Sequence, residues 1–266
     1  MADILSMSFF RNALIMGGLL SLLFGLLSFF IVIRRMTFLG AGIAHTAFGG
    51  VALGVLLGVH PFLTSAVFCV LSALLIGRMV KRETLTYDTA IGIFFALAMA
   101  LGAIFIALRK AYTFDLSGYL FGNILGVTST DLWLTAITLM LFIPFYFGFF
   151  HKLLFASFDD RVASTSGVKS DRLESALLVF LALIIVVSIK MVGIILISAL
   201  VVLPASFGLL ISRDYRTVIT ASILFTLVTM SGGLLASYFL DSPAGATMVV
   251  LGALLYFITL LFTQSR

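Results

Sequence analysis

Long apolar runs separated by short polar stretches occupy most of this chain. Runs that approach the roughly 20 residues needed for a helix to cross a membrane occur at 12–33, 41–59, 61–79, 89–108, 131–150, 175–189, 191–212, 217–239 and 243–262. The run at 175–189 is short and joins the next run at Lys190. The pattern therefore predicts an all-α, polytopic transmembrane helical bundle of about eight or nine spans.

A further apolar segment, 115–127 (DLSGYLFGNILGV), is too short to cross a membrane. Its length indicates a half-helix or a re-entrant piece. Irregular backbone at membrane depth is tolerated only against protein or a water-filled cavity. We therefore expect this segment to lie beside a transport pathway.

Composition supports a membrane protein, because 62% of the 266 residues are hydrophobic and only 10% are charged. Soluble domains average about 25% charged residues, so lipid must be the main solvent of this chain. The length predicts a single transmembrane domain over residues 1–266. Cys69 is the only cysteine, which excludes a disulfide framework or a cysteine-based zinc site within one chain.

The basic residues explain the sequence pI of about 9.6 without nucleic-acid binding, because they lie in short loops and form no basic face. Cytoplasmic loops of membrane proteins are enriched in Lys and Arg. Nine spans with a cytoplasmic C-terminus place 12 of the 16 basic residues inside. The four outside are Arg11, Arg109, Lys110 and Lys190, and the reversed orientation inverts this ratio.

The longest polar stretch, 151–174 (HKLLFASFDDRVASTSGVKSDRLE), is cytoplasmic in this orientation. Asp159 and Asp160 are suited to begin a helix, since carboxylates favour the first turn. Gly167 is suited to end it in a left-handed cap. The stretch predicts a two-turn helix that docks onto a soluble partner, or else an ordinary solvated loop.

Sequence motifs for catalysis are missing from the chain. No phosphate-binding loop of the form G-x-x-x-x-G-K-[ST] occurs, so any ATP hydrolysis belongs to another subunit. No nucleophile–base constellation appears either, so we expect no enzyme and no catalytic residues. We also expect the interiors of the spans to carry no Asp, Glu, Lys or Arg, which argues against a secondary transporter or channel working alone.

The run 40–59 carries a stripe of small residues every four positions: Gly42, Thr46, Gly50, Gly54 and Gly58. Such stripes let helix backbones approach closely. His45 lies beside the stripe, flanked by Thr46, with Ala41 and Gly49 one turn away. These positions mark the helix as a candidate wall of a pathway.

His45 is a candidate metal ligand, because a titratable side chain within a span is costly and imidazole binds borderline metals well. A packed, hydrogen-bonded histidine is the alternative. One histidine cannot complete a metal site, but a two-fold dimer would supply two. Asp115 and Asp241 lie outside in this orientation, where they either attract cations at a pore mouth or cap helices.

Five stretches resemble the metal-ion family of ABC importer permeases, which carry zinc, manganese or iron(II). They are RRMTFLGAGIAHTAFGGVALG (34–54), TYDTAIGIFFALAMALG (86–102), DLSGYLFGNILGVTSTDL (115–132), VGIILISALVVLPA (192–205) and YFLDSPAGATMVVL (238–251). They are spread over almost the whole chain and fall in the same order as in the family.

The resemblance implies a type II ABC importer-like fold in the bacterial or archaeal cytoplasmic membrane. It implies a homodimer, two cytoplasmic ATPase subunits and an extracytoplasmic metal-binding protein, with no cofactor bound permanently. Ala163-x-x-x-Gly167 resembles the loop motif of these permeases, which makes Asp159, Asp160, Ala163 and Gly167 candidate coupling residues. Alternating access would follow closure of the ATPase pair.

The resemblance also bears on the transported metal. His45 matches a family histidine that commonly has an Asp four residues before it, but this chain has Ala41 there. The missing carboxylate leaves the metal open among zinc, manganese and iron(II), with zinc favoured. Ser198, before Pro204, is a second candidate pathway residue. An importer for a siderophore or cobalamin is the alternative.

Overall fold

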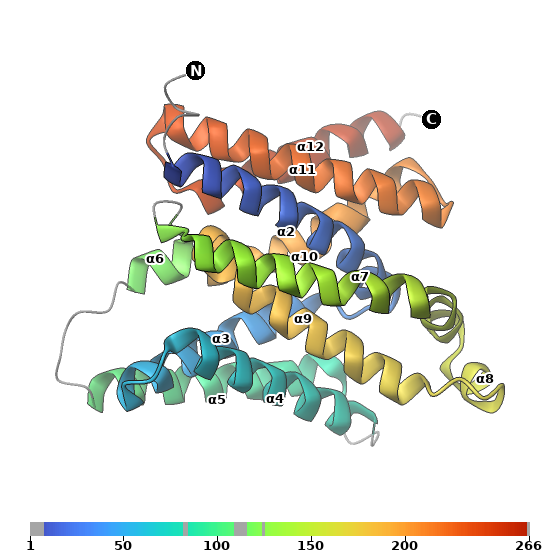
Figure 1. Ribbon diagram of the computed structural model, residues 1–266. Helices are drawn as coiled ribbons and strands as arrows, with labels where there is room; N and C mark the ends of the chain where they lie inside the picture. Colours follow the sequence, from blue (N-terminus) through green and yellow to red (C-terminus); the bar gives the residue numbers. More distant parts are fainter. Residues whose placement is uncertain (1–7, 82–84, 109–115, 124–125, 265–266) are drawn as a thin grey trace. The chain divides into compact units, whose positions relative to one another are not determined.

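The computed structural model describes residues 8–81, 85–108, 116–123 and 126–264 (Figure 1). These residues contain no strand, and nine of their helices are long and apolar enough to span a membrane, which confirms the predicted helical bundle. The nine are α2 (Ser8–Ile33), α3 (Thr37–Leu57), α4 (Pro61–Lys81), α5 (Tyr87–Leu108), α7 (Ser129–Phe158), α9 (Ser170–Val192), α10 (Ile194–Ile211), α11 (Tyr215–Leu240) and α12 (Ala244–Gln264).

Two short helices complete the described elements, α6 (Leu116–Phe121) and α8 (Asp160–Thr165). The helix α6 lies in the segment expected to be a half-helix, and α8 lies in the expected cytoplasmic helix. Helical backbone also occupies the two ends of the predicted cytoplasmic coupling loop at about 151–174, because α7 continues to Phe158 and α9 begins at Ser170. The short run at 175–189 is likewise part of a 23-residue helix.

The chain forms two compact units. The first comprises Met1–Arg35, Leu116–Pro144 and Val187–Arg266, and the second comprises Met36–Asp115 and Phe145–Val186. The helices α7 and α9 each contribute one segment to each unit.

In the first unit, α11 packs against α2, α10 and α12. Glycines mark the closest crossings. A Cβ on Gly25 of α2 would lie 2.7 Å from the Cα of Ile223 on α11, and one on Gly233 would lie 2.5 Å from the Cα of Met248 on α12. These helices therefore meet backbone to backbone, as small residues allow in membranes.

In the second unit, α3 packs against both α4 and α5 (Figure 1). The small-residue stripe is responsible: a Cβ on Gly50 would lie 2.6 Å from the Cα of Ser65, and one on Gly42 would lie 2.4 Å from a methyl carbon of Ile91. The predicted close packing is confirmed at these positions. Gly58 differs, because it ends α3 in a left-handed cap with φ of 68°.

Candidate functional site

His45 presents a single imidazole from the middle of α3. Its Nδ1 lies 2.8 Å from the carbonyl oxygen of Ala41. A carbonyl oxygen can only accept, so Nδ1 is the donor in this bond, and Nε2 is the nitrogen that a neutral ring would offer to a metal. Metal-binding histidines commonly donate their other N–H in this way. The half-buried ring also lies 4.7 Å from that of Phe95, which fixes its orientation.

Thr46 and Gly49, the other pathway candidates on α3, face neighbouring helices. The Thr46 hydroxyl is fully buried and donates to the carbonyl of Ile43 at 2.7 Å. It also lies 3.7 Å from the Sγ of Cys69 on α4. A Cβ on Gly49 would lie 2.8 Å from the carbonyl oxygen of Ala98 on α5. Both positions therefore serve packing here, and a pathway role stays a prediction.

Metal ligands do not gather elsewhere in the part of the chain that the structure describes. Among those residues, no group of three His, Cys, Asp or Glu side chains is placed to hold a metal ion. His45 is therefore not part of a three-ligand site among the described residues.

The remaining pathway candidates lie apart from His45 in the sequence and serve local structure. Asp241 is exposed and ends α11 in a left-handed cap with φ of 49°, its N–H directed at the carbonyl of Ser237. Ser198 on α10 donates to the carbonyl of Ile195. Asp115 lies outside the described residues.

An ion pair with a buried carboxylate, in the first unit, was not predicted. The Nζ of Lys190 lies 2.8 Å from one carboxylate oxygen of Asp131 and 2.9 Å from the other. The Asp131 side chain is only 8% exposed, whereas that of Lys190 is 37% exposed. The pair joins the first turn of α7 to the last turn of α9, at the ends of these helices rather than in their interiors, where uncharged side chains were expected.

The carboxylate of Asp131 is also held by its own helix. It accepts the N–H of Thr128 at 2.9 Å and the Thr128 hydroxyl at 2.7 Å, while Thr128 Oγ1 receives the Asp131 N–H. This reciprocal arrangement is a capping box. Its T-x-x-D pattern before an apolar run was visible in the sequence, and it was the signal that could have revealed Asp131.

The ion pair lies beside a tight backbone junction. The N–H of Asn123, just after α6, donates to the carbonyl of Lys190 at 2.8 Å. Gly193, between α9 and α10, has φ of +88°, and a Cβ there would lie 2.4 Å from the carbonyl oxygen of Leu120. Lys190, at the end of α9, thus contacts α7 through its side chain and the residues just after α6 through its backbone carbonyl.

The short helix α8 is capped at both ends as predicted. The Asp159 carboxylate accepts the N–H groups of Arg161 and Val162 at 2.9 and 3.0 Å. At the other end, Gly167 has φ of +84°, and the Val168 N–H reaches back to the carbonyl of Ala163. Together with the bond from Gly167 to Ser164 this forms a Schellman motif, which needs glycine for its conformation.

The two faces of α8 differ in exposure. Ala163 is fully buried, and Asp160 accepts a hydrogen bond from Ser170 at the start of α9. Val162 is 49% exposed and Phe158, at the end of α7, is 79% exposed. Exposed apolar side chains beside a polar rim are typical of interaction surfaces.

Comparisons with known proteins match nearly the whole chain. A sequence model of the ABC 3 transport family matches residues 6–263. The manganese transport system membrane protein MntC of Listeria monocytogenes is 34% identical over 97% of this chain and 92% of its own length. The high-affinity zinc uptake system membrane protein ZnuB of Haemophilus influenzae is 30% identical over 96% of this chain and 97% of its own length.

A solved structure agrees with these relatives. It is described as PsaBC from Streptococcus pneumoniae in complex with Fab, and one of its chains superposes with a TM-score of 0.86 at 33% identity. The match covers 97% of this chain and 93% of that one. The fold of the described helices is therefore shared with that protein.

Proposed function

We propose that this chain, which belongs to the ABC 3 transport family, is the membrane-spanning subunit of an ATP-driven importer for divalent metal ions. The observation that carries the proposal is the full-length similarity to proteins named as manganese and zinc transport subunits. The free Nε2 of His45 within an apolar helix is consistent with it. The nine apolar helices place the chain in a membrane as a multi-pass protein.

Transport requires partners that this chain does not contain. ATP hydrolysis belongs to a separate ATPase subunit, since the sequence has no phosphate-binding loop. An extracytoplasmic metal-binding protein delivers the ion. A second copy of the chain completes a two-fold assembly, which pairs the two His45 side chains and supplies the ligand that one chain lacks.

The helix α8 couples the ATPase to the membrane. Asp159, Asp160, Ala163 and Gly167 hold its shape, and the exposed side chains of Phe158 and Val162 enter the partner surface. A helix capped at both ends moves as a unit, so displacement of α8 is transmitted to the ends of α7 and α9. This role rests on the caps and on the exposed apolar residues.

The type of ligand at His45 bears on which metal is transported. Imidazole suits zinc, while carboxylate oxygens suit manganese. Ala41 removes the carboxylate nearest to His45, so zinc is the favoured ion, with manganese and iron(II) as alternatives. A transit site also binds its ion weakly, because tight binding would prevent release.

Metal uptake by cells that carry this chain with its ATPase tests the proposal. Zinc, manganese and iron(II) are each supplied to wild type, His45→Ala and the control His151→Ala, which removes an exposed histidine from α7. We expect ATPase-dependent uptake of one metal that collapses only in His45→Ala. Uptake that survives His45→Ala would show that His45 serves helix packing rather than metal transport. No uptake of any metal would favour an importer for a larger ligand such as a siderophore or cobalamin.

A further inference from the structure

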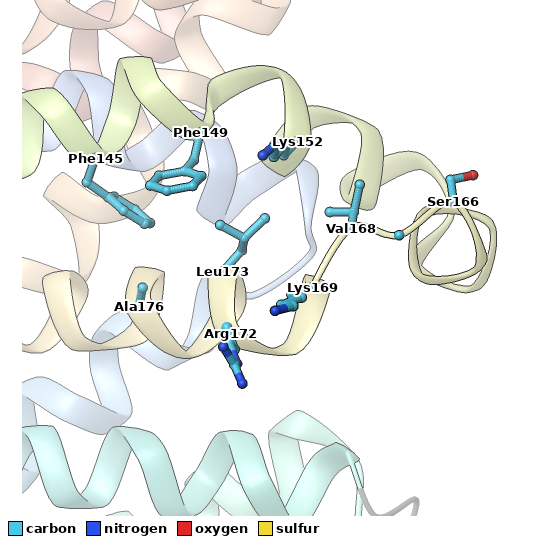
Figure 2. Close-up of a pocket in the computed structure, with 10 residues that line it drawn as sticks. Phe145, Phe149, Lys152, Ser166, Val168, Lys169, Arg172, Leu173 and Ala176 are labelled. Carbon is cyan, nitrogen blue, oxygen red and sulfur yellow. The ribbon is translucent and has the colours of Figure 1, made fainter.

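A cavity of about 620 Å³ opens between α7 and α9 in the second unit (Figure 2). Its residues come from the second half of α7, from 166–169 after α8 and from the first turns of α9. Its size falls within the range of pockets that hold small molecules. The rings of Phe145 and Phe180, 4.8 Å apart, bring α7 and α9 together at its inner end.

The walls of this cavity are apolar. Phe145 and Phe149 project from α7 toward Leu173 and Ala176 on α9, as Figure 2 shows. These side chains offer no charge and no side-chain hydrogen-bonding group. They therefore favour a hydrocarbon portion of a ligand over an inorganic ion.

Three cations line the end of the cavity nearest α8: Lys152, Lys169 and Arg172. All three are exposed, and within the described residues their side chains make no ion pair or hydrogen bond. The Nζ of Lys152 lies 5.6 Å from the ring of Phe149, which leaves its charge available. The cavity thus combines an apolar interior with an unneutralised positive rim.

The acidic residues nearby are already engaged. Asp171 pairs with Lys81 at 3.0 Å, Glu174 accepts the Tyr87 hydroxyl, and Asp160 accepts that of Ser170. Asp159 accepts the first N–H groups of α8. These hydrogen bonds leave the carboxylates charged, but none of these four residues lines the cavity, whose lining carries three cations and no carboxylate.

We propose that this cavity binds one anionic phospholipid, with its phosphate at Lys152, Lys169 and Arg172 and the start of an acyl chain between Phe149 and Leu173. Basic pockets between helices on the cytoplasmic side of a membrane recognise anionic headgroups in this manner. The predicted orientation places these residues on that side. The lipid stabilises the α7–α8–α9 hairpin next to the coupling helix.

Titration of phosphatidylglycerol into the full-length chain, purified with its ATPase in neutral detergent, tests this site. Phosphatidylcholine with the same acyl chains and inorganic phosphate are the comparison ligands. We expect saturable binding of phosphatidylglycerol, much weaker binding of phosphatidylcholine and no competition by phosphate. Each removed cation lowers the affinity about fivefold, so Lys152→Gln/Lys169→Gln/Arg172→Gln lowers it roughly a hundredfold.

Two further variants separate the site from general charge. Lys169→Gln lowers phosphatidylglycerol affinity, whereas Arg213→Gln, which removes an exposed cation elsewhere, leaves it unchanged. Ala176→Trp fills the apolar part with all three cations kept, and it also lowers the affinity. Equal thermal unfolding midpoints without lipid show that both cavity variants fold.

Other outcomes overturn the proposal. Phosphatidylglycerol binding that is unchanged in both the triple variant and Ala176→Trp rules out this cavity as the lipid site. Competition by inorganic phosphate identifies a free-anion site instead. Loss of the ATPase from the triple variant with lipid binding unchanged assigns the cations to the protein partner.

Discussion

Replacing Lys190 with methionine should destabilise the chain more than neutralising its partner Asp131. The Asp131 carboxylate is 8% exposed, so Lys190→Met leaves a buried anion without its counter-charge. Breaking a buried pair in this way costs about 3–5 kcal/mol. Thr128 retains two hydrogen bonds to the carboxylate, which places the expected loss at the lower end, about 3 kcal/mol.

Asp131→Asn acts on the other side of the pair. It leaves the Lys190 ammonium group without a counter-charge, but that side chain is 37% exposed and water can hydrate it in place. The amide oxygen still accepts the Thr128 N–H, so the expected loss is about 1 kcal/mol. The double variant removes both charges and should therefore be more stable than Lys190→Met alone.

Unfolding of the purified chain by sodium dodecyl sulfate in mixed micelles measures the three free energies. Thr138→Val is the control, since it removes a buried hydroxyl of α7 that donates to the carbonyl of Leu134 and contacts neither member of the pair. The reasoning is refuted if Asp131→Asn costs more than Lys190→Met. It is also refuted if the free energy of unfolding lost in the double variant equals the sum of the losses in the two single variants, because the two charges would then act independently.

Two glycines provide further predictions, each with a control. Gly54→Ala should lower the free energy of unfolding by about 1–3 kcal/mol through overpacking, since a Cβ there would lie 2.3 Å from the Thr64 hydroxyl. Gly92→Ala is the control: a Cβ there meets no atom within 4 Å, so the protein should not be destabilised in the same unfolding assay. Gly167→Ala should cost about 1 kcal/mol, because its φ of +84° disfavours any side chain. Gly167→Ala should also lower the metal-stimulated ATPase activity of the complex. The control is Gly148→Ala, a helical position where a Cβ meets open space, and it should lower that activity less. Equal activities of the two variants would exclude a coupling role for the α8 cap.

Hydropathy alone predicted the number of spans, because each helix must satisfy its backbone internally and cover itself with apolar side chains in lipid. The ends were less well predicted. Residues such as Lys152 and Arg172 interrupt the apolar run, yet the backbone of α7 and α9 remains helical through them. Hydropathy indicates which side chains are stable in lipid, whereas the residue at which a helix begins depends on capping residues such as Thr128 and Asp159.

The candidate ligand His45 could be named from sequence, but its surroundings could not. The hydrogen bond to Ala41 is local, four residues away, and the helical period implies it. The contact with Phe95 on α5 depends on how α3 and α5 cross. That crossing places Gly42 against the Ile91 side chain and Gly49 against the Ala98 carbonyl, and no single-sequence pattern specifies these partners.

The pairing of Asp131 with Lys190 shows how far sequence reasoning could have gone. A carboxylate at the start of an apolar span needs a cation on the same side of the membrane. The predicted orientation offers four outside cations, Arg11, Arg109, Lys110 and Lys190, and nothing in the sequence chooses among them. Only the backbone junction at Asn123 and Gly193 selects Lys190.

The observed ion pairs in turn constrain the topology. Asp131 begins α7 and Lys190 ends α9, so their contact requires an even number of crossings between them, and α7 and α9 supply two. The same holds in the second unit, where Lys81 at the end of α4 meets Asp171 at the start of α9 with α5 and α7 between them. Both pairs are satisfied only if α6 and α8 do not cross, which is the nine-span arrangement that the basic residues favour.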